Sequence, residues 1–166
     1  MNMIKIGPVG AGYGAGGIIW DEKGRDQVAG FLISYNENAI LSLQFLYYED
    51  DNFVLSTLFY YADDGFNDHS AIVFDYPSEL LTSISGSSEK VGNDKPVLTS
   101  IKFGTNKGSY GPFGTPKVTT EPNNIADFDF QIGNHRLFGG FHGTENYRRV
   151  QSIGVYVKTQ VNDQLQ

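Results

Sequence analysis

A glycine-rich stretch near the start of the chain offers the first possible chemistry. Gly12, Gly14 and Gly17 have the Gly-x-Gly-x-x-Gly spacing of dinucleotide-binding loops. That mechanism needs a preceding buried strand and a following helix whose N-terminus holds a pyrophosphate. Ile18-Ile19-Trp20-Asp21 follows instead and is not a helix start. The spacing therefore favours a glycine loop whose backbone N–H groups approach some other polar ligand.

The acidic and histidine residues lack the spacing of a metal or catalytic centre. Residues 63–69, Asp-Asp-Gly-Phe-Asn-Asp-His, are like a loose calcium loop without the alternating ligands and final Glu of an EF-hand. The histidines, at positions 69, 135 and 142, are not at metal-site spacing, and His142 in its apolar stretch is expected to be a hydrogen-bonded core or rim residue. Neither a Gly-x-Ser-x-Gly elbow nor a His-Glu-x-x-His motif occurs. We predict no metal, no cofactor and no enzymatic activity.

The composition limits the partners of the protein. Its 166 residues suit one domain, and 12 basic against 19 acidic residues give a net charge of -7. Such a chain has no excess of cations for nucleic acid or an anionic membrane. It has no cysteine and no apolar run near the ~20 residues of a membrane span. Residues 1–6 lack the long apolar stretch typical of a signal peptide, so we expect none. We expect a cytoplasmic protein.

The charge is unevenly spread along the chain. Between Asp26 and Glu89 there are eleven acidic residues and no Lys or Arg. Either this half carries solvated acidic loops, or it forms an acidic face that docks a basic partner or repels nucleic acid.

Alternation of apolar and polar residues runs from end to end and predicts strands. Examples are Leu41, Leu43, Phe45 and Tyr47 in one run, and Phe128, Phe130 and Ile132 against Asp127, Asp129 and Gln131 in another. Turn clusters separate these runs, which predicts an all-β domain of roughly ten to twelve short strands. The aromatic pairs around Tyr47-Tyr48 and Phe59-Tyr60-Tyr61 are left open as core, edge-strand surface or subunit contact.

Several segments together resemble the jacalin-related lectins of plants. They are Gly7–Gly10 with Gly16–Asp21, Tyr76–Gly86, Ser100–Phe103 leading into Thr105–Gly114, Gly139–Gly143 and Ile153–Val157. The resemblance spans residues 4–158. It implies a β-prism of three four-stranded Greek-key sheets with pseudo-threefold symmetry, in a domain over residues 1–158 followed by a loose C-terminal tail, 159–166.

The resemblance also implies where a sugar binds. In these lectins the opening glycine loop and the last hairpin loop meet one monosaccharide with backbone N–H groups and with the carboxylate of a Gly-x-x-x-Asp motif. The residues that correspond to this site are Gly16, Gly17, Glu145, Asn146, Tyr147, Arg148, Arg149 and Gln151. Gln151 stands in place of the Asp, and Tyr147 or its neighbour in place of the Gly, in a loop one residue longer. Glu145 offers a carboxylate from that longer turn.

Three segments look most like cytosolic jacalin-type proteins that restrict plant viruses: Gly7–Gly10, Phe138–Thr144 and Gln151–Tyr156. The resemblance implies a homo-oligomeric lectin for mannose- or glucose-type glycans, with a role in plant antiviral defence. The alternative is an interaction module that binds viral or host proteins, keeps the prism and has lost sugar binding.

Overall fold

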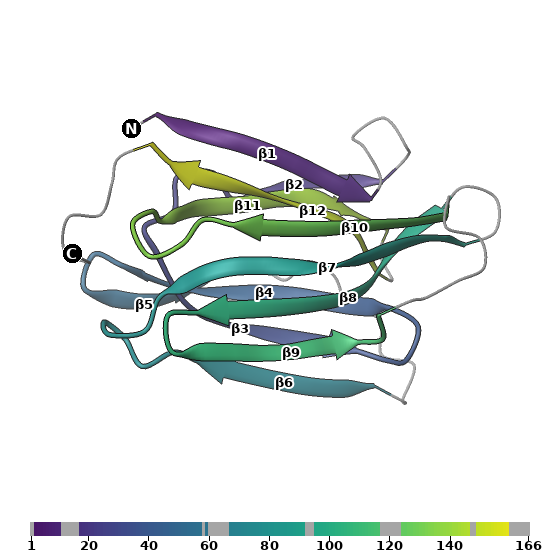
Figure 1. The fold of residues 1–166 in the computed structure, drawn as a ribbon, viewed down its shortest axis with the longest axis horizontal. Coiled ribbons are helices and arrows are strands. Elements are labelled where there is room, and N and C mark those ends of the chain that lie inside the picture. The colour runs from purple at the N-terminus through teal and green to yellow at the C-terminus, as the bar shows by residue number, and fades with distance from the viewer. Residues whose placement is uncertain are drawn as a thin grey trace.

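The computed structural model describes residues 2–10, 17–57, 59, 67–91, 95–116, 124–146 and 149–159. Within them the chain forms twelve strands and no α-helix (Figure 1). The strands are β1 (Met3–Gly10), β2 (Ile18–Asp21), β3 (Gln27–Tyr35), β4 (Ile40–Glu49), β5 (Asn52–Leu55), β6 (Asp68–Val73), β7 (Leu81–Val91), β8 (Lys95–Thr105), β9 (Gly108–Gly114), β10 (Ile125–Gln131), β11 (Phe138–Glu145) and β12 (Val150–Lys158). Accordingly, no helix in this described part could cross a membrane.

The strands form three antiparallel sheets that repeat one topology. Sheet A has the order β1-β12-β11-β2, sheet B the order β5-β4-β3-β6, and sheet C the order β10-β7-β8-β9. In sheets B and C three consecutive strands pair in sequence and the fourth returns beside the first, which is a Greek key. Sheet A has the same order, with β11 and β12 followed by β1 from the other end of the chain, and β2 beside β11. The predicted all-β prism of three Greek-key sheets is confirmed.

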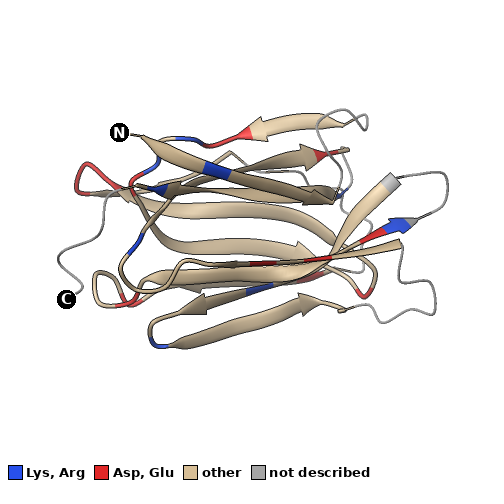
Figure 2. Cartoon of the chain, turned by 45° about the horizontal axis from the view of Figure 1, so that its top comes forward, with Lys and Arg blue, Asp and Glu red and all other residues tan. Residues whose placement is uncertain are grey.

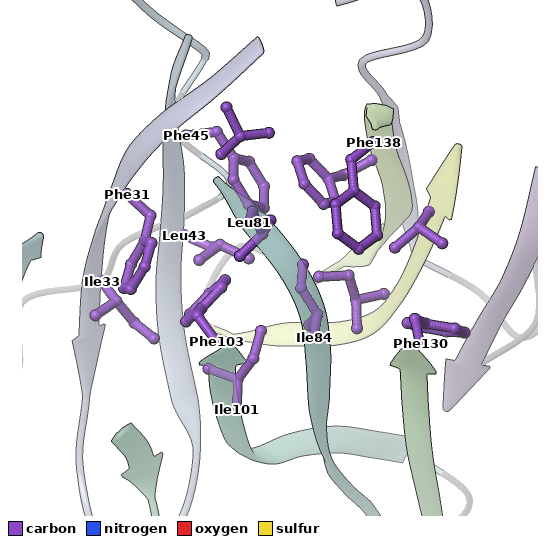
Figure 3. Close-up of a cluster of buried hydrophobic side chains, with 14 of the residues drawn as sticks. Phe31, Ile33, Leu43, Phe45, Leu81, Ile84, Ile101, Phe103, Phe130 and Phe138 are labelled. Atoms are coloured by element: carbon purple, nitrogen blue, oxygen red, sulfur yellow. The ribbon is translucent and has the colours of Figure 1, made fainter. Parts of the chain in front are cut away.

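The core lies where the inner faces of the three sheets meet (Figure 3). Stacked aromatic rings join the sheets: Phe31 of sheet B lies 3.7 Å from Phe103 of sheet C, and Phe45 of sheet B lies 3.9 Å from Phe141 of sheet A, between ring centroids. The clean alternation of β10 is confirmed, with Phe128 and Phe130 buried.

The aromatic residues left open by the sequence divide between core and surface. Tyr47 and Phe59 are buried in the core, whereas Tyr48 is half-buried on the outer face of sheet B. Tyr60 and Tyr61 lie outside the described residues.

One extra residue interrupts an inner strand of each sheet. The register shifts between Ser34 and Tyr35 opposite β4, between Ser87 and Ser88 opposite β8, and between Thr144 and Glu145 opposite β12. The residues left without a partner are Leu41, Thr99 and Gln151, and all three are buried. A β-bulge of this kind re-aims a side chain, so the strict alternation fails there. The prediction that Leu41 shares the face of Leu43 is therefore wrong: Leu41 packs in a separate small cluster with Ala39 and Val97.

The first residue of the predicted C-terminal tail is held by hydrogen bonds. The Thr159 hydroxyl donates to the Asn2 carbonyl at 2.8 Å, and Arg136 donates to the Thr159 carbonyl at 2.7 Å. Residues 160–166 lie outside the described part of the chain.

A buried carboxylate ties the segment before β7 to the β8–β9 hairpin. Glu79 is 5% exposed and accepts hydrogen bonds from the Asp75 N–H at 3.0 Å, the Thr105 hydroxyl at 2.8 Å and the Tyr110 hydroxyl at 2.9 Å. Burial by itself would raise the pKa of Glu79, but these hydrogen bonds and the charge of Lys107 together hold that pKa below its usual value.

We expect Glu79→Gln to lower the free energy of unfolding at neutral pH by about 1.5 kcal/mol, because charged acceptors make stronger hydrogen bonds than neutral ones. A carboxylate whose pKa is depressed by folding stabilises the fold above its unfolded-state pKa, and the effect is lost as the pH falls through the folded-state pKa. Denaturant unfolding at several pH values should therefore show the two proteins converging in acid. A constant gap at every pH would contradict this role of the charge.

Candidate functional site

The site residues that the structure describes gather at one end of sheet A. Glu145, the last residue of β11, pairs with Ile18 of β2 on one side and with Val150 of β12 on the other. Gly17 directly precedes β2, and Gln151 follows Val150. The structure therefore brings Gly17, Glu145, Asn146, Arg149 and Gln151 together at the end of the prism opposite the two chain termini (Figure 1). Gly16, Tyr147 and Arg148 of the predicted site lie outside the described residues.

Gly17 has no room for a side chain. A Cβ atom placed on it would lie 2.1 Å from Oε1 of Gln151 and 3.0 Å from the carbonyl oxygen of Glu145. Real Cβ atoms do not approach other atoms so closely, and the missing side chain lets the amide of Gln151 lie against the backbone of Gly17. Glycine here permits the close contact between the start of β2 and the end of the β11–β12 hairpin.

Gln151 is buried rather than open to solvent. It is 2% exposed, and its Oε1 has no hydrogen-bond partner in the described part of the chain. The β-bulge accounts for this placement, because Gln151 is the extra residue of β12 and its side chain leaves the regular alternation. A buried acceptor without a donor is costly, so this oxygen is poised to accept a hydrogen bond.

The hairpin turn next to Gln151 is closed by two hydrogen bonds. The N–H of Arg149 donates to Oδ1 of Asn146 at 3.0 Å, and the N–H of Asn146 donates to the Arg149 carbonyl at 3.2 Å. The side chain of Asn146 thus shapes the turn. Its amide oxygen therefore accepts a hydrogen bond from the protein's own backbone.

Glu145 supplies the carboxylate of the described site. It is half-buried, and burial raises the pKa of its carboxyl group. An ionised carboxylate here would accept strong hydrogen bonds from vicinal hydroxyl groups of a sugar.

Gly10 also borders the site, and the sequence reasoning did not include it. It ends β1 with a φ of 109°, and a Cβ atom there would lie 2.6 Å from the carbonyl oxygen of Gln151. Gly114 of sheet C is placed in the same way: a Cβ atom on it would lie 2.2 Å from the carbonyl oxygen of Thr99. The pattern that could have found Gly10 is therefore the internal repeat, in which a glycine covers the bulge residue.

In the described residues no group of three or more His, Asp or Glu side chains is placed so that it could hold a metal ion. Of the calcium-like loop only Asn67, Asp68 and His69 are described, and β6 begins at Asp68. His142 is fully buried, with Nε2 2.9 Å from the Ile6 carbonyl oxygen, and burial lowers its pKa. The prediction that His142 is a hydrogen-bonded core residue is confirmed.

Comparison with known proteins gives the same assignment from sequence and from structure. The sequence matches the jacalin-like lectin domain over residues 6–156. Protein RESTRICTED TEV MOVEMENT 1 of Arabidopsis thaliana is 36% identical over 158 residues, covering 93% of this chain and 87% of the relative. Jacalin-related lectin 2 of Arabidopsis thaliana is 35% identical over 160 residues, covering 93% of this chain and 86% of the relative.

Among solved structures, a mannose-specific jacalin-related lectin from Morus nigra in complex with mannose superimposes with a TM-score of 0.78 at 25% identity. The match covers 95% of this chain and 96% of that lectin. The matching family and this structural neighbour are lectins, not enzymes, in agreement with the prediction from sequence. The chain belongs to the jacalin-like lectin family.

Proposed function

We propose that the protein binds mannose- or glucose-type glycans through the site formed by Gly17, Glu145 and the turn that leads to Gln151. The observation that carries the proposal is the meeting of a glycine backbone, a half-buried carboxylate and an unpartnered buried amide oxygen at one end of sheet A. Such a set matches the alternating donors and acceptors of a monosaccharide. The mannose complex of the Morus nigra lectin, which has the same fold, supports this ligand class.

We infer a role in antiviral restriction, acting in the cytoplasm. Its support is the likeness to Protein RESTRICTED TEV MOVEMENT 1, whose name states a restriction of movement. A homo-oligomer would suit this role, because several weak monosaccharide sites on one particle bind a multivalent glycan by avidity.

We expect Glu145→Gln to weaken the binding of mannose by about tenfold, because a neutral acceptor replaces a charged one. Affinity for mannose should also fall on acidification, at a higher pH than for an ordinary glutamate, since burial raises the Glu145 pKa and protonation removes the acceptor charge. Titration calorimetry after a broad glycan array provides the measurement. Asp129→Asn, which removes a carboxylate from sheet C, is the matched control and should bind as the parent does.

The second candidate is a protein-interaction module that no longer binds sugar. The burial of Gln151 favours it, because the residue at the position of the family carboxylate is neutral and enclosed. A blank glycan array from a folded, oligomeric sample would support this module and contradict the lectin proposal. If a protein partner is captured, excess free monosaccharide should displace it when the partner binds through the sugar site. A partner that stays bound would support the interaction module.

A further inference from the structure

The four strands of sheet B contain no Lys or Arg, and the nearest Arg, Arg25 before β3, forms an ion pair with Glu49 of β4 at 3.0 Å. All four of its strands fall between Asp26 and Glu89, the stretch of the sequence that has eleven acidic residues and no Lys or Arg. The uneven charge of the sequence thus becomes one side of the molecule. The Asp50-Asp51 turn joins β4 to β5 at the end of the prism where both termini lie (Figure 1), and Figure 2 shows both acidic and basic segments at that end.

Sheet B also exposes apolar side chains. Eight large apolar side chains are exposed in the described residues, and five of them belong to this sheet: Leu32, Phe53, Val54, Leu55 and Val73. Four residues on neighbouring strands lie opposite one another in turn: Leu55 of β5, Leu46 of β4, Gly30 of β3 and Val73 of β6. The two outer ones, Leu55 and Val73, are 51% and 65% exposed. This cross-strand register makes an apolar row that crosses all four strands.

Three aromatic rings extend this row toward the acidic end. Tyr48 lies 4.3 Å from Tyr76 and 5.2 Å from Phe53 between ring centroids, and Phe53 is 54% exposed. The Asp50-Asp51 turn directly follows the Glu49–Asn52 pair, next to the paired Tyr48 and Phe53, so the acidic turn adjoins these rings. Burial, the neighbouring Tyr48 and the charges of Asp51 and Asp26 raise the pKa of Tyr76. Aromatic faces beside carboxylates are a favourable environment for a guanidinium or ammonium group.

The acidic turn places two carboxylates next to each other. Asp50 and Asp51 have φ angles of 50° and 63°, as the two central residues of a two-residue hairpin turn require. Adjacent carboxylates of the same charge repel each other. A cation bound here would relieve that repulsion.

At its other side the row borders a hollow. The hollow has a volume of about 430 Å³ and is floored by Ser34 and Ser42, with Leu32, Gln44 and His69 around it. The hydroxyl groups of the two serines hydrogen-bond to each other. The surface therefore has an apolar row, with aromatic rings beside an acidic turn at one end and a hollow at the other.

We propose that this face docks an extended segment of a partner protein in which apolar side chains are flanked by Lys or Arg. The surface patch is defined as Leu32, Tyr48, Phe53, Leu55, Val73 and Tyr76. Charge complementarity selects this occupant: a second copy of the chain would bring its own -7 charge and the same acidic turn to the contact, and an anionic membrane would be repelled. Lys158, at the far end of β12 from Gln151, donates a hydrogen bond to the backbone carbonyl of Asp26 at 2.8 Å, so the aromatic end of the patch lies opposite the sugar site.

The test is selection from a random-peptide library on the immobilised full-length protein, followed by titration of the selected peptides. We expect enrichment of peptides with apolar residues flanked by Lys or Arg, and an affinity that falls as salt is added. Phe53→Ala and Asp51→Asn should each weaken binding by about fivefold or more. Asn is well accommodated at the φ angle of Asp51, so this variant keeps the turn. Ile19→Ala, at a residue 57% exposed on sheet A, and Asp129→Asn are the matched controls and should bind normally.

Three outcomes would overturn the proposal. They are no enrichment of basic peptides, equal binding by Phe53→Ala and Ile19→Ala, or a shift from dimer to monomer caused by Phe53→Ala in sedimentation equilibrium, which would make a second copy the occupant. Excess mannose should leave the selected peptides bound. This readout separates the patch from the sugar site, so failure of one proposal is distinguishable from failure of the other.

Discussion

Gly17→Ala is expected to lower the free energy of unfolding by about 2 kcal/mol and to abolish the binding of mannose, because the added Cβ would overlap the amide of Gln151. The Cβ would lie 2.1 Å from Oε1 of Gln151 and 3.0 Å from the Glu145 carbonyl oxygen. Gln151 is buried and cannot swing freely into solvent, so either its side chain or the start of β2 must shift. Both shifts move the groups that the proposed site presents to a sugar.

A double-mutant cycle tests the contact directly. In a Gln151→Ala background the oxygen at 2.1 Å is gone and the remaining contact at 3.0 Å is only tight, so Gly17→Ala should cost less than half as much. Thermal or denaturant unfolding of the four proteins gives the coupling energy, and calorimetry with mannose follows binding in parallel. If Gly17→Ala costs the same in both backgrounds, Gln151 does not pack against Gly17.

The fold could be predicted from sequence because its strands alternate strongly. In β10 two phenylalanines face the core and the alternating aspartates, Asp127 and Asp129, face outward, as the period of two requires. The resemblance to plant lectins then supplied the order of the strands, which alternation alone does not give. Alternation does not predict the bulges. It places Leu41 on the inward face with Leu43, but Leu41 is the extra residue of β4, and its side chain packs in a different cluster.

The proximity of the candidate residues could be predicted, but their environment could not. The spacing from Ile153-Gly154 assigns Gln151 to the candidate site, and the structure places it beside Gly17. Its burial depends on the register between β11 and β12, which is a property of two strands and not of the sequence around Gln151. The same limit applies to β5, where all four residues are exposed and no alternation distinguishes a face.

Phe103→Ala is expected to give the largest loss of stability, about 4 kcal/mol, because it removes a fully buried ring and leaves a cavity. The ring of Phe103 stacks on Phe31 at 3.7 Å, so the substitution removes a contact between sheets B and C (Figure 3). Phe53→Ala is the matched control: the same atoms are removed from a side chain 54% exposed on the outer face, and the cost should stay below about 1 kcal/mol.

Denaturant unfolding of the full chain measures both variants. If the cost of Phe103→Ala were near that of Phe53→Ala, contacts between the sheets would contribute little, and each Greek key would have to be stable by itself. We expect the opposite, because a four-stranded sheet in this protein buries its apolar face only against the other two. The difference between the two variants also distinguishes two roles of phenylalanine in this chain: Phe103 packs the sheets together, and Phe53 is exposed for the proposed partner.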